Sequence, residues 1–537
     1  MEKDEFTSTD DRGLIWQKYC GFLNLSPEEF MEIQEDLLLD EIDLVTGTSL
    51  GKKIMRNGRP TNVAEFRSQV PLTTYEDYAA YLDQRNDDVL SEKPFCWVHT
   101  SGRSGSFKWV PYTERAHRKT IESVVAGFIL ACATRKGEVN VKGTERILYN
   151  APPRPYFSGM IATSVPKLYD FRGVLAPEVS EKMEFQERIA EGFRLSLRTG
   201  VDFLVSLSSI LVKIGEGFTA GLQGMKLSAF MLHPAVLFRL AKALFRSKIE
   251  GRSLLPKDLW RVKAIMCGGT DTTIYRKQLI HYWGKEPYEY YGATEAGIIA
   301  IQSWNKKGMT FLPLSDFYEF IPETEWLKNK QDKEYQPSTV LLNEVEEGKR
   351  YELVITNFYG MPFLRYRLGD LIKIVSLRDD EAGINLPHMF FESRADDLID
   401  IAGFTRLDEK TVWQAIANSG IRYQEWTIRK GSHEGKPGLQ LYIEMKEKMA
   451  AEEIEHVVHD NLKAIDSNYR DLSNMLEIQP LKATLLSRGT FQRFFEEKQA
   501  AGLDLAHLKP PHTNASDATI DDLLRSSSVS QTEGIET

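Results

Sequence analysis

The chain has 537 residues, of which 42% are hydrophobic and 27% charged, the proportions of an ordinary soluble globular protein. A chain of this length exceeds one hydrophobic core, so at least two domains are expected. The formal net charge is −10, from 67 basic and 77 acidic residues without a basic block, which argues against a nucleic acid as partner.

The cysteines and the N-terminus argue against two further classes of protein. Four cysteines are scattered along the chain without a C-x-x-C pair, which speaks against a zinc ribbon and a disulfide framework. The charged N-terminus lacks the apolar stretch of a signal peptide, and no window offers the roughly 20 apolar residues of a membrane span. We therefore expect a cytoplasmic protein without an integral membrane segment.

The first half of the chain alternates helical and extended patterns. Residues 9–84 are expected to be mainly helical, and residues 95–100 form an apolar, β-prone stretch that runs into a Ser/Gly-rich loop. Residues 181–248 are again expected to be helical. Within them, residues 227–248 combine an apolar face with a basic face, which suits a membrane surface or, more commonly in α/β domains, packing on a sheet.

The second half contains the strongest strand signals. Short apolar segments at residues 262–267 and 288–291 end in glycines and are predicted to be buried strands. Residues 351–356 and 371–375 are predicted to form a β-pair. Strands that alternate with helices and end in glycine turns favour a parallel or mixed sheet with ligands at the carboxyl ends of its strands. The expected fold class is therefore α/β.

The character of the sequence changes after Arg394, where short helices and strands indicate a compact α+β module. We expect a large N-terminal domain at residues 1–394, with mixed or parallel sheets flanked by helices, and a small mobile α+β C-terminal domain at residues 395–512. Residues 513–537 are rich in Ser, Thr and Asp and poor in large apolar residues, so a disordered tail is predicted there.

Three separated segments carry residue types that suit a nucleotide: Thr100–Lys108 (TSGRSGSFK), Tyr290–Glu295 (YYGATE) and Arg365–Asp370 (RYRLGD). A loop rich in Ser and Gly offers backbone N–H groups and hydroxyls to phosphate oxygens, and its lysine adds a positive charge. The glutamate that ends the second segment can hold Mg²⁺. The aspartate that ends the third can accept hydrogen bonds from both hydroxyls of a ribose.

Each segment alone also has an ordinary structural interpretation. The loop is not a Walker A sequence, and taken alone it fits a plain polar loop as well as a phosphate loop. Glu295 could merely satisfy a helix dipole, and Asp370 could bond its own backbone in a turn. The order and separation of all three segments favour one shared adenylating site.

In this order the segments resemble the acyl-adenylating superfamily, which includes firefly luciferase and the acyl-CoA synthetases. Val70–Tyr78 (VPLTTYEDY) and Lys108–Pro111 (KWVP) resemble, more closely, the N-terminal signature of the auxin-responsive-promoter family of acyl-acid amido synthetases. Arg488–Phe491 (RGTF) and Leu508–Pro511 (LKPP) resemble that family's C-terminal landmarks. The resemblance covers residues 66–512 and implies a bacterial-type member.

The resemblance implies a role for individual residues. Those that would contact the ATP phosphates are Thr100, Ser101, Gly102, Ser104, Gly105 and Lys108. Those that would border the adenine are Gly268, Gly269 and Thr270. Further nucleotide contacts would come from Tyr291, Thr294, Arg367 and Asp370, the last of these at the ribose. The resemblance also implies Mg²⁺ on Glu295, a hinge at Asp396 within Arg394–Asp397 (RADD), and catalytic roles for Lys108, Glu295 and Lys509.

Two features depart from the family pattern. Arg103 stands in the phosphate loop where Thr or Ser is usual, which removes a hydroxyl and adds a charge. No lysine in the superfamily's C-terminal catalytic context is evident, and Lys509 is the best candidate for that role. An intact adenylating half beside an unusual second half leaves the acceptor of the acyl group open.

The implied function is an ATP-dependent ligase that converts a carboxylic acid to its acyl-adenylate, releases pyrophosphate and joins the acid to an amino acid as an amide. One alternative is a ligase that forms a CoA thioester. Another is a non-catalytic nucleotide- or acyl-binding protein, which would bind ATP without releasing pyrophosphate. The acyl pocket is expected at residues 155–160 and the helices near Phe203, lined for an aromatic or aliphatic acid.

Overall fold

The computed structural model describes two compact units of the chain. Unit 1 comprises Met1–Leu207, Ile214–Gly268 and Gln278–Ser393, and unit 2 comprises Ser208–Lys213, Gly269–Lys277 and Arg394–Thr537. The residues that the structure describes are 11–87, 90–100, 107–150, 152–183, 185–219, 233–268, 272–395, 399–401, 405–407, 409–433, 436–476, 480–500 and 512–532.

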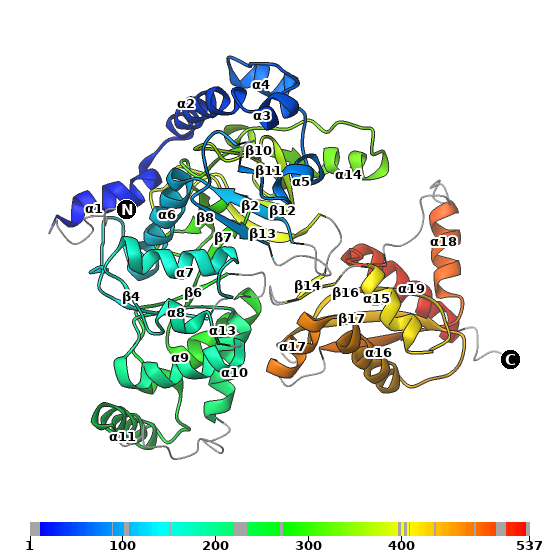
Figure 1. The fold of residues 1–537 in the computed structure, drawn as a ribbon. Helices are drawn as coiled ribbons and strands as arrows, with labels where there is room; N and C mark the ends of the chain where they lie inside the picture. Colours follow the sequence, from blue (N-terminus) through cyan, green and yellow to red (C-terminus); the bar gives the residue numbers. More distant parts are fainter. Residues whose placement is uncertain are drawn as a thin grey trace. The chain divides into compact units, whose positions relative to one another are not determined.

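Unit 1 is built on a mixed sheet, in which the described strands follow the order β10-β11-β12-β13-β9-β8-β7-β6-β5-β3-β4 (Figure 1). The parallel part consists of β3 (Arg146–Tyr149), β4 (Arg172–Gly173), β5 (Phe203–Ser206), β6 (Ala264–Cys267) and β7 (Pro287–Ala293). The remaining strands are β8 (Gly297–Gln302), β9 (Met309–Phe311), β10 (Asp316–Pro322), β11 (Arg350–Asn357), β12 (Tyr366–Ser376) and β13 (His388–Arg394). The predicted α/β class is confirmed.

A separate two-stranded sheet in unit 1 carries the Ser/Gly-rich loop. Its strands, β1 (Cys96–His99) and β2 (Trp109–Tyr112), run antiparallel, with His99 opposite Trp109. The loop thus joins two paired strand ends, and its two flanks are held at a fixed separation. The position of residues 101–106 within that loop lies outside the described part of the chain.

Helices flank the sheet of unit 1, and their starts follow ordinary capping rules. Before α6 (Glu114–Cys132), the hydroxyl of Thr113 accepts from the backbone N–H of Ala116 at 3.2 Å. This mostly buried helix packs against β6 and β8. The other helices named in the chain up to residue 331 are α1 (Arg12–Cys20), α2 (Pro27–Thr46), α3 (Ser49–Ile54), α4 (Val63–Gln69), α5 (Glu76–Leu82), α7 (Phe157–Leu168), α8 (Pro177–Ser180), α9 (Phe185–Thr199), α10 (Ser208–Thr219), α11 (Pro234–Ile249), α12 (Pro256–Leu259), α13 (Thr272–Trp283) and α14 (Glu323–Gln331).

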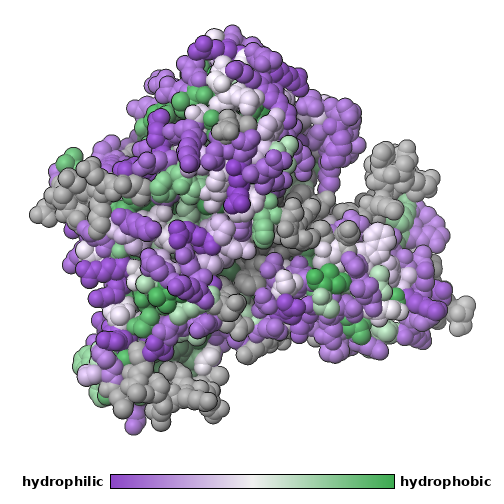
Figure 2. Space-filling view, viewed as in Figure 1, coloured by the Kyte–Doolittle hydropathy of each residue, from purple (hydrophilic) through white to green (hydrophobic). Residues whose placement is uncertain are grey.

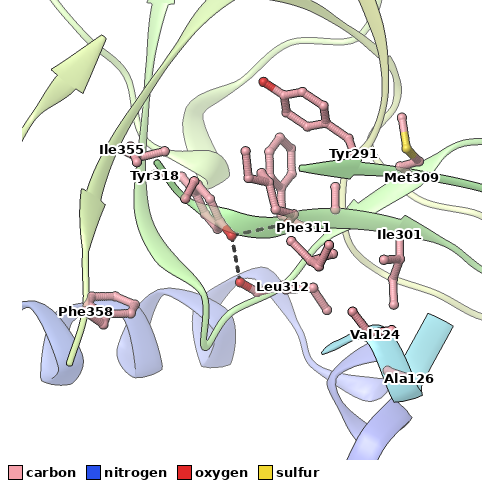
Figure 3. Packing of buried hydrophobic residues seen from close by; sticks show 14 of the residues in the cluster. Val124, Ala126, Tyr291, Ile301, Met309, Phe311, Leu312, Tyr318, Ile355 and Phe358 are labelled. Atoms are coloured by element: carbon pink, nitrogen blue, oxygen red, sulfur yellow. Dashed lines mark hydrogen bonds between the residues drawn. The ribbon is translucent and has the colours of Figure 1, made fainter. Parts of the chain in front are cut away.

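The core of unit 1 joins both parts of the mixed sheet to the helices around it. Figure 3 shows Tyr318 of β10 among buried neighbours that include Phe311 of β9 and Ile355 of β11. The Tyr318 hydroxyl donates to the backbone carbonyls of Leu312 at 2.9 Å and Ile299 at 3.2 Å. Its polar atom is therefore satisfied inside an apolar core, as a buried hydroxyl requires.

Unit 2 has an α+β core of its own. A three-stranded sheet is formed by β16 (Tyr423–His433), β17 (Lys436–Met445) and β18 (Leu481–Leu486), with β16 and β17 antiparallel and β17 and β18 parallel. The short strands β14 (Ile399–Ile401) and β15 (Thr405–Leu407) form a separate pair. Its helices include α15 (Glu409–Asn418), α16 (Ala451–Ile465), α17 (Ser467–Leu476) and α18 (Thr490–Ala500).

The prediction of a disordered tail at residues 513–537 is wrong for its described part. Residues Asp517–Thr532 form helix α19, which buries Ile520 and Leu523 in a cluster with Phe491 and Phe494. The tail is poor in large apolar residues, but Ile520 and Leu523 lie three residues apart and share one helical face. Composition over the whole tail therefore concealed a short apolar stripe that a neighbouring helix covers.

Candidate active site

The two flanks of the Ser/Gly-rich loop are bonded to each other in unit 1. The backbone N–H of Thr100 donates to the carbonyl of Lys108 at 3.1 Å, and the N–H of Lys108 donates to the Thr100 hydroxyl at 3.3 Å. These two hydrogen bonds join the ends of the loop, so the backbone at Lys108 is held in place. The other residues expected in this loop to contact phosphate lie outside the described residues: Ser101, Gly102, Ser104 and Gly105.

A short chain of polar contacts links Lys108 to Glu295. The Lys108 ammonium donates to the Tyr366 hydroxyl at 3.3 Å, and that hydroxyl donates to Glu295 Oε1 at 3.2 Å. The Lys108 Nζ atom also lies 3.8 Å from the same carboxylate oxygen. The Lys108 side chain remains 40% exposed, whereas that of Glu295 is 11% exposed. The cation can thus reach a ligand while its partner carboxylate is held in place.

Aromatic rings extend the environment of the Lys108 ammonium. It lies 5.4 Å from the centre of the Tyr75 ring and 6.0 Å from that of Tyr366, distances at which a cation is attracted to a ring face. The Tyr75 hydroxyl accepts from the backbone N–H of Trp109 at 2.7 Å. Tyr75 belongs to the segment Val70–Tyr78, so this signature segment forms one wall of the lysine site.

The same signature segment is bonded to the start of β12. The N–H of Thr73 donates to the carbonyl of Arg365, and the N–H of Arg367 donates to the carbonyl of Thr73, both at 2.9 Å. The buried Arg365 guanidinium donates twice to Glu319, each time at 2.9 Å, and also to the carbonyl of Val70 at 2.6 Å. These bonds fix the backbone on both sides of Tyr366.

A second contact joins β7 to the part of β12 where its register with β11 shifts. The Tyr291 hydroxyl donates to Asp370 Oδ2 at 2.7 Å, and both side chains are buried. Gly369, directly before Asp370, has φ of 71°, in the left-handed region that favours glycine. The positive φ at this position accounts for the glycine in the RYRLGD motif. With this backbone conformation, the Asp370 side chain reaches Tyr291.

Arg367 does not join this cluster. Its guanidinium donates to both carboxylate oxygens of Glu352, at 2.9 and 2.6 Å, and to Asn329 Oδ1 at 2.8 Å. Tyr366 and Arg367 are neighbours in a strand, so their side chains point to opposite faces. Tyr366 points to Glu295, and Arg367 therefore supports the sheet on the other side. The expected contact of Arg367 with a nucleotide stays a prediction.

Two further residues expected at the nucleotide, Gly268 and Thr294, directly follow strands β6 and β7. The carbonyl of Thr294 accepts from the Tyr112 hydroxyl at 2.8 Å. Gly268 follows β6, and a Cβ atom at this position would lie 3.0 Å from the Tyr290 hydroxyl oxygen, so a larger residue would crowd that side chain. Gly269 and Thr270 lie outside the described residues, as do Asp396 and Lys509.

An apolar cavity of about 30 Å³ adjoins the carboxyl ends of the parallel strands in unit 1. It is lined by side chains from α6, α7, β3 and β5 to β8, among them Tyr149, Met266 and Tyr290. Gly127 of α6 also lines it, and a Cβ atom there would lie 3.0 Å from Met266 Cε. Residues 155–160, which were expected to line the acyl pocket, do not line this cavity, to which α7 contributes Ile161.

Three family models match the chain and together cover more than half of it. They describe the GH3 family N-terminal domain at residues 21–151, its central domain at residues 309–386 and its C-terminal domain at residues 409–517. The chain belongs to the GH3 family. The first two matches contain Lys108 and Asp370, and the third lies in unit 2.

Several curated relatives of this GH3 family chain align over most of its length at low identity. The jasmonoyl–L-amino acid synthetase JAR6 of Nicotiana attenuata is 22% identical, covering 89% of this chain and 90% of that protein. The indole-3-acetic acid-amido synthetase GH3.10 of Arabidopsis thaliana is 23% identical, covering 85% and 87%. Both relatives are plant proteins, so the expected bacterial type stays a prediction.

Solved structures resemble the fold of this GH3 family chain. The GH3.15 acyl acid amido synthetase is 18% identical with a TM-score of 0.51, covering 92% of this chain and 93% of its own. A 2-hydroxyisobutyryl-CoA ligase, in complex with 2-HIB-AMP and CoA, is 14% identical with a TM-score of 0.52, covering 86% and 87%. At these identities the likeness shows the fold.

Two site residues were missed by reasoning from the sequence, Tyr75 and Tyr366. Both lie inside quoted motifs, but a tyrosine in a strand or before a helix is usually part of the core. The available signal was alternation along β12, which puts Tyr366 on the face opposite Arg367. Its contact with Lys108 depends on how distant segments meet, and sequence spacing does not give that.

Proposed function

We propose that this GH3 family chain is an ATP-dependent ligase that activates a carboxylic acid as its acyl-adenylate and transfers the acyl group to an amino acid. The first step releases pyrophosphate and the second releases AMP. The names of the relatives, which are amido synthetases of plant acids, support this class of reaction.

The observation that carries the proposal is the position of strand β7 between two chemically different sites. Tyr290 lines the apolar cavity, while its neighbour Tyr291 bonds to Asp370. Glu295 follows the same strand and bonds to Tyr366, which contacts Lys108. One strand therefore contributes both to an acidic and basic cluster and to an apolar cavity, the two kinds of site that joining a carboxylate to a phosphate requires.

In the first step, a carboxylate oxygen of the acid attacks the α-phosphorus of ATP and pyrophosphate leaves. Lys108 would neutralise charge that develops on the phosphate oxygens, and Asp370 would bind the ribose hydroxyls. Tyr291 would hold Asp370 in position through its 2.7 Å hydrogen bond. Tyr366 would orient both Lys108 and Glu295, so it is proposed as a positioning residue.

Glu295 is the proposed ligand of Mg²⁺. A carboxylate oxygen is a suitable ligand for this cation, which typically takes its remaining ligands from substrate phosphates and water. Among the described residues, no group of three His, Cys, Asp or Glu side chains forms a metal site. Bound there, Mg²⁺ would supply charge neutralisation on the phosphates, and Lys108 would lie beside it.

The cavity supports an acid with a compact apolar body. Its lining is almost wholly apolar, and the buried Tyr149 hydroxyl forms no hydrogen bond with a described residue. A buried hydroxyl without a partner is unfavourable, so a substrate that offers one hydrogen-bonding group would satisfy it. We therefore propose an acid with a small apolar group that carries one polar substituent, such as a carbonyl or hydroxyl.

The second step transfers the acyl group to the amine, as the names of the amido synthetases among the relatives indicate. The amino group attacks the acyl carbon, the amine loses a proton, and AMP leaves. The proposed assignments that stand on the resemblance alone are phosphate contacts at Ser101, Gly102, Ser104 and Gly105, adenine contacts at Gly269 and Thr270, a hinge at Asp396 and a second catalytic lysine at Lys509.

The test is pyrophosphate release from MgATP against a panel of carboxylic acids, with products identified by mass spectrometry in the presence of amino acids or CoA. An amide mass together with pyrophosphate is the expected result. A CoA ester in place of an amide would favour the thioester ligase instead. ATP binding without pyrophosphate release from any acid would contradict catalysis and favour a binding protein.

A further inference from the structure

Helix α11 exposes its large apolar residues instead of burying them. Phe238, Phe245 and Ile249 are 71%, 68% and 69% exposed, more than any other large hydrophobic residue in the described chain. They are separated by seven and four residues, so they share one face of the helix. The expectation that this helix packs its apolar face on a sheet is wrong for these residues.

The opposite face of α11 attaches it to unit 1 through small residues. Val236, Ala243 and Ser247 are buried, and the helix contacts α9 and α12. Arg239 strengthens this attachment, because its guanidinium donates to the carbonyl of Ser196 in α9 at 3.3 Å. The helix is thus attached to unit 1 by the face that carries its small buried residues, and the exposed phenylalanines do not contribute to that attachment.

The charged residues of α11 are all basic. The helix contains Arg239, Lys242, Arg246 and Lys248 and no acidic residue, although the whole chain has a net charge of −10. Lys242 and Lys248 are exposed and make no ion pair with a described residue. Elsewhere on the face seen in Figure 2, the surface is mostly hydrophilic, and hydrophobic residues form only small groups.

From this face we infer that α11 docks unit 1 onto the surface of an anionic lipid bilayer. Large apolar side chains flanked by lysines characterise helices that lie in the membrane interface, where the rings enter the acyl boundary and the ammonium groups meet phosphate headgroups. At 16 residues with four charges, α11 is too short and too polar to span the bilayer. Indeed, no helix in the described residues qualifies as a membrane span.

Charge is what favours a bilayer over a second copy of the chain. Two copies of α11 face to face would bring like charges together, whereas anionic headgroups complement Lys242 and Lys248. The inference is independent of the proposed chemistry, because no residue of α11 belongs to the candidate active site.

The test is co-sedimentation of the full-length protein with vesicles of phosphatidylcholine, with and without phosphatidylglycerol. The wild-type protein is expected to sediment with the anionic vesicles and to be released by salt. Phe238→Ser with Phe245→Ser should lower the partition coefficient at least about tenfold, because two apolar side chains no longer enter the bilayer. Leu14→Ser with Leu377→Ser is the matched control, since both leucines are exposed elsewhere in unit 1.

A variant with altered charge distinguishes binding to an anionic lipid surface from apolar attraction alone. Lys242→Glu with Lys248→Glu keeps both phenylalanines and should lose binding to anionic vesicles, by roughly fivefold or more for each lysine. Equal sedimentation of wild type and either α11 variant would overturn the inference. The inference would also be overturned if the wild-type protein bound neither kind of vesicle and dimerised through Phe238 and Phe245, as measured by light scattering.

Discussion

At the scale of single residues, the side chains of the RYRLGD motif point to two faces of one strand and have different partners on each. Arg365 and Arg367 bond to Glu319 and Glu352, which fixes the strand in the sheet. Tyr366 faces Glu295 and Lys108 instead. In this structure the two arginines of the motif bond to carboxylates of the sheet, whereas Tyr366 and Asp370 reach the proposed site.

Lys108→Gln tests the proposed phosphate contact. It should lower the rate of adenylate formation by about 10²–10³-fold. The reason is that the substitution removes the positive charge that would neutralise the negative charge developing on the phosphate. Tyr366→Phe should give a smaller loss, since it removes the bridging hydroxyl but keeps the ring beside Lys108. Pyrophosphate release measures both, with Lys52→Gln on α3 as an exposed control. An unchanged rate in Lys108→Gln would contradict the assignment.

Gly127→Val tests the cavity. The added side chain would enter the space beside Met266, where even a Cβ atom lies 3.0 Å from Cε. The KM for the acid should rise about tenfold or more, because few methylene groups decide occupancy of an apolar pocket, while the KM for ATP stays near wild type. Gly217→Val in α10 is the matched control, since nothing lies within 4 Å of a Cβ atom there. Equal effects on both substrates would speak against an acyl site.

At the scale of elements, α19 shows how a helix of weak composition is stabilised by its neighbours. Its buried residues pack against Phe491 and Phe494 of α18. Near its end, Ser527 accepts from the N–H of Ser487 at 2.9 Å, which ties the helix to the segment after β18. Tertiary contacts of this kind, more than intrinsic propensity, keep short helices folded.

Leu523→Ala is expected to destabilise unit 2. Leu523 is fully buried, and truncation of a buried leucine typically costs about 2–5 kcal/mol. Leu524→Ala on the same helix should change stability by less than about 0.5 kcal/mol, because Leu524 is 40% exposed. Chemical denaturation followed by far-ultraviolet circular dichroism compares the two. Similar losses in both variants would mean that α19 is not packed as described.

His512 gives unit 2 a pH-dependent element. Its ring stacks on Trp426, and its nitrogens lie 2.8 Å from Glu425 and 2.6 Å from Glu409. Hydrogen bonds to Glu425 and then Glu409 raise the pKa of His512 above its ordinary value of 6.5. The charged imidazole is therefore favoured in the folded state. Its stabilisation is complete below pH 6.5 and is lost as the pH rises through the raised pKa.

His512→Gln should accordingly lower the melting temperature at acidic pH and have less effect at alkaline pH. The measurement is a series of thermal melts from acidic to alkaline pH on the full chain. His456→Gln, an exposed histidine on α16, serves as the control and should leave the pH profile unchanged. A His512→Gln effect that is constant with pH would indicate a packing role alone.

At the scale of the whole molecule, the proposed nucleotide site and the apolar cavity both belong to unit 1. The lysine cluster, the Tyr291–Asp370 contact and the cavity all come from residues of that unit. Unit 2 has a separate core around its own three-stranded sheet. Binding of the nucleotide and the acid is thus expected to require unit 1 residues, and ligand effects should appear there first.

MgATP should therefore stabilise unit 1 selectively. At about one hundred times its dissociation constant, a ligand that binds only the folded state adds about 2.7 kcal/mol. Hydrogen exchange should show slower exchange in β1, β2, β7 and β12 when MgATP is present. Glu295→Gln should remove the magnesium-dependent part of this protection and retain the part due to ATP alone. Full magnesium dependence in Glu295→Gln would exclude this carboxylate as the ligand.

Part of the fold and of the site could be read from the chain itself. The apolar segments 262–267, 288–291, 351–356 and 371–375 overlap β6, β7, β11 and β12, because buried strands need apolar residues in short runs. The order of three motifs was enough to indicate an adenylating family, and the family models agree. Local sequence determined these features since each depends on residues close together in the chain.

Other features were decided only by tertiary structure. Tyr75 and Tyr366 meet Lys108 from distant segments, and Ile520 and Leu523 hold a helix only because Phe491 and Phe494 cover them. Arg367 bonds to Glu352 on the face of β12 opposite Tyr366, a partner that spacing in the sequence does not give. The sequence determined the residue types and their order, while packing decided which polar groups meet, because a side chain's partner depends on the three-dimensional path of segments that are hundreds of residues apart.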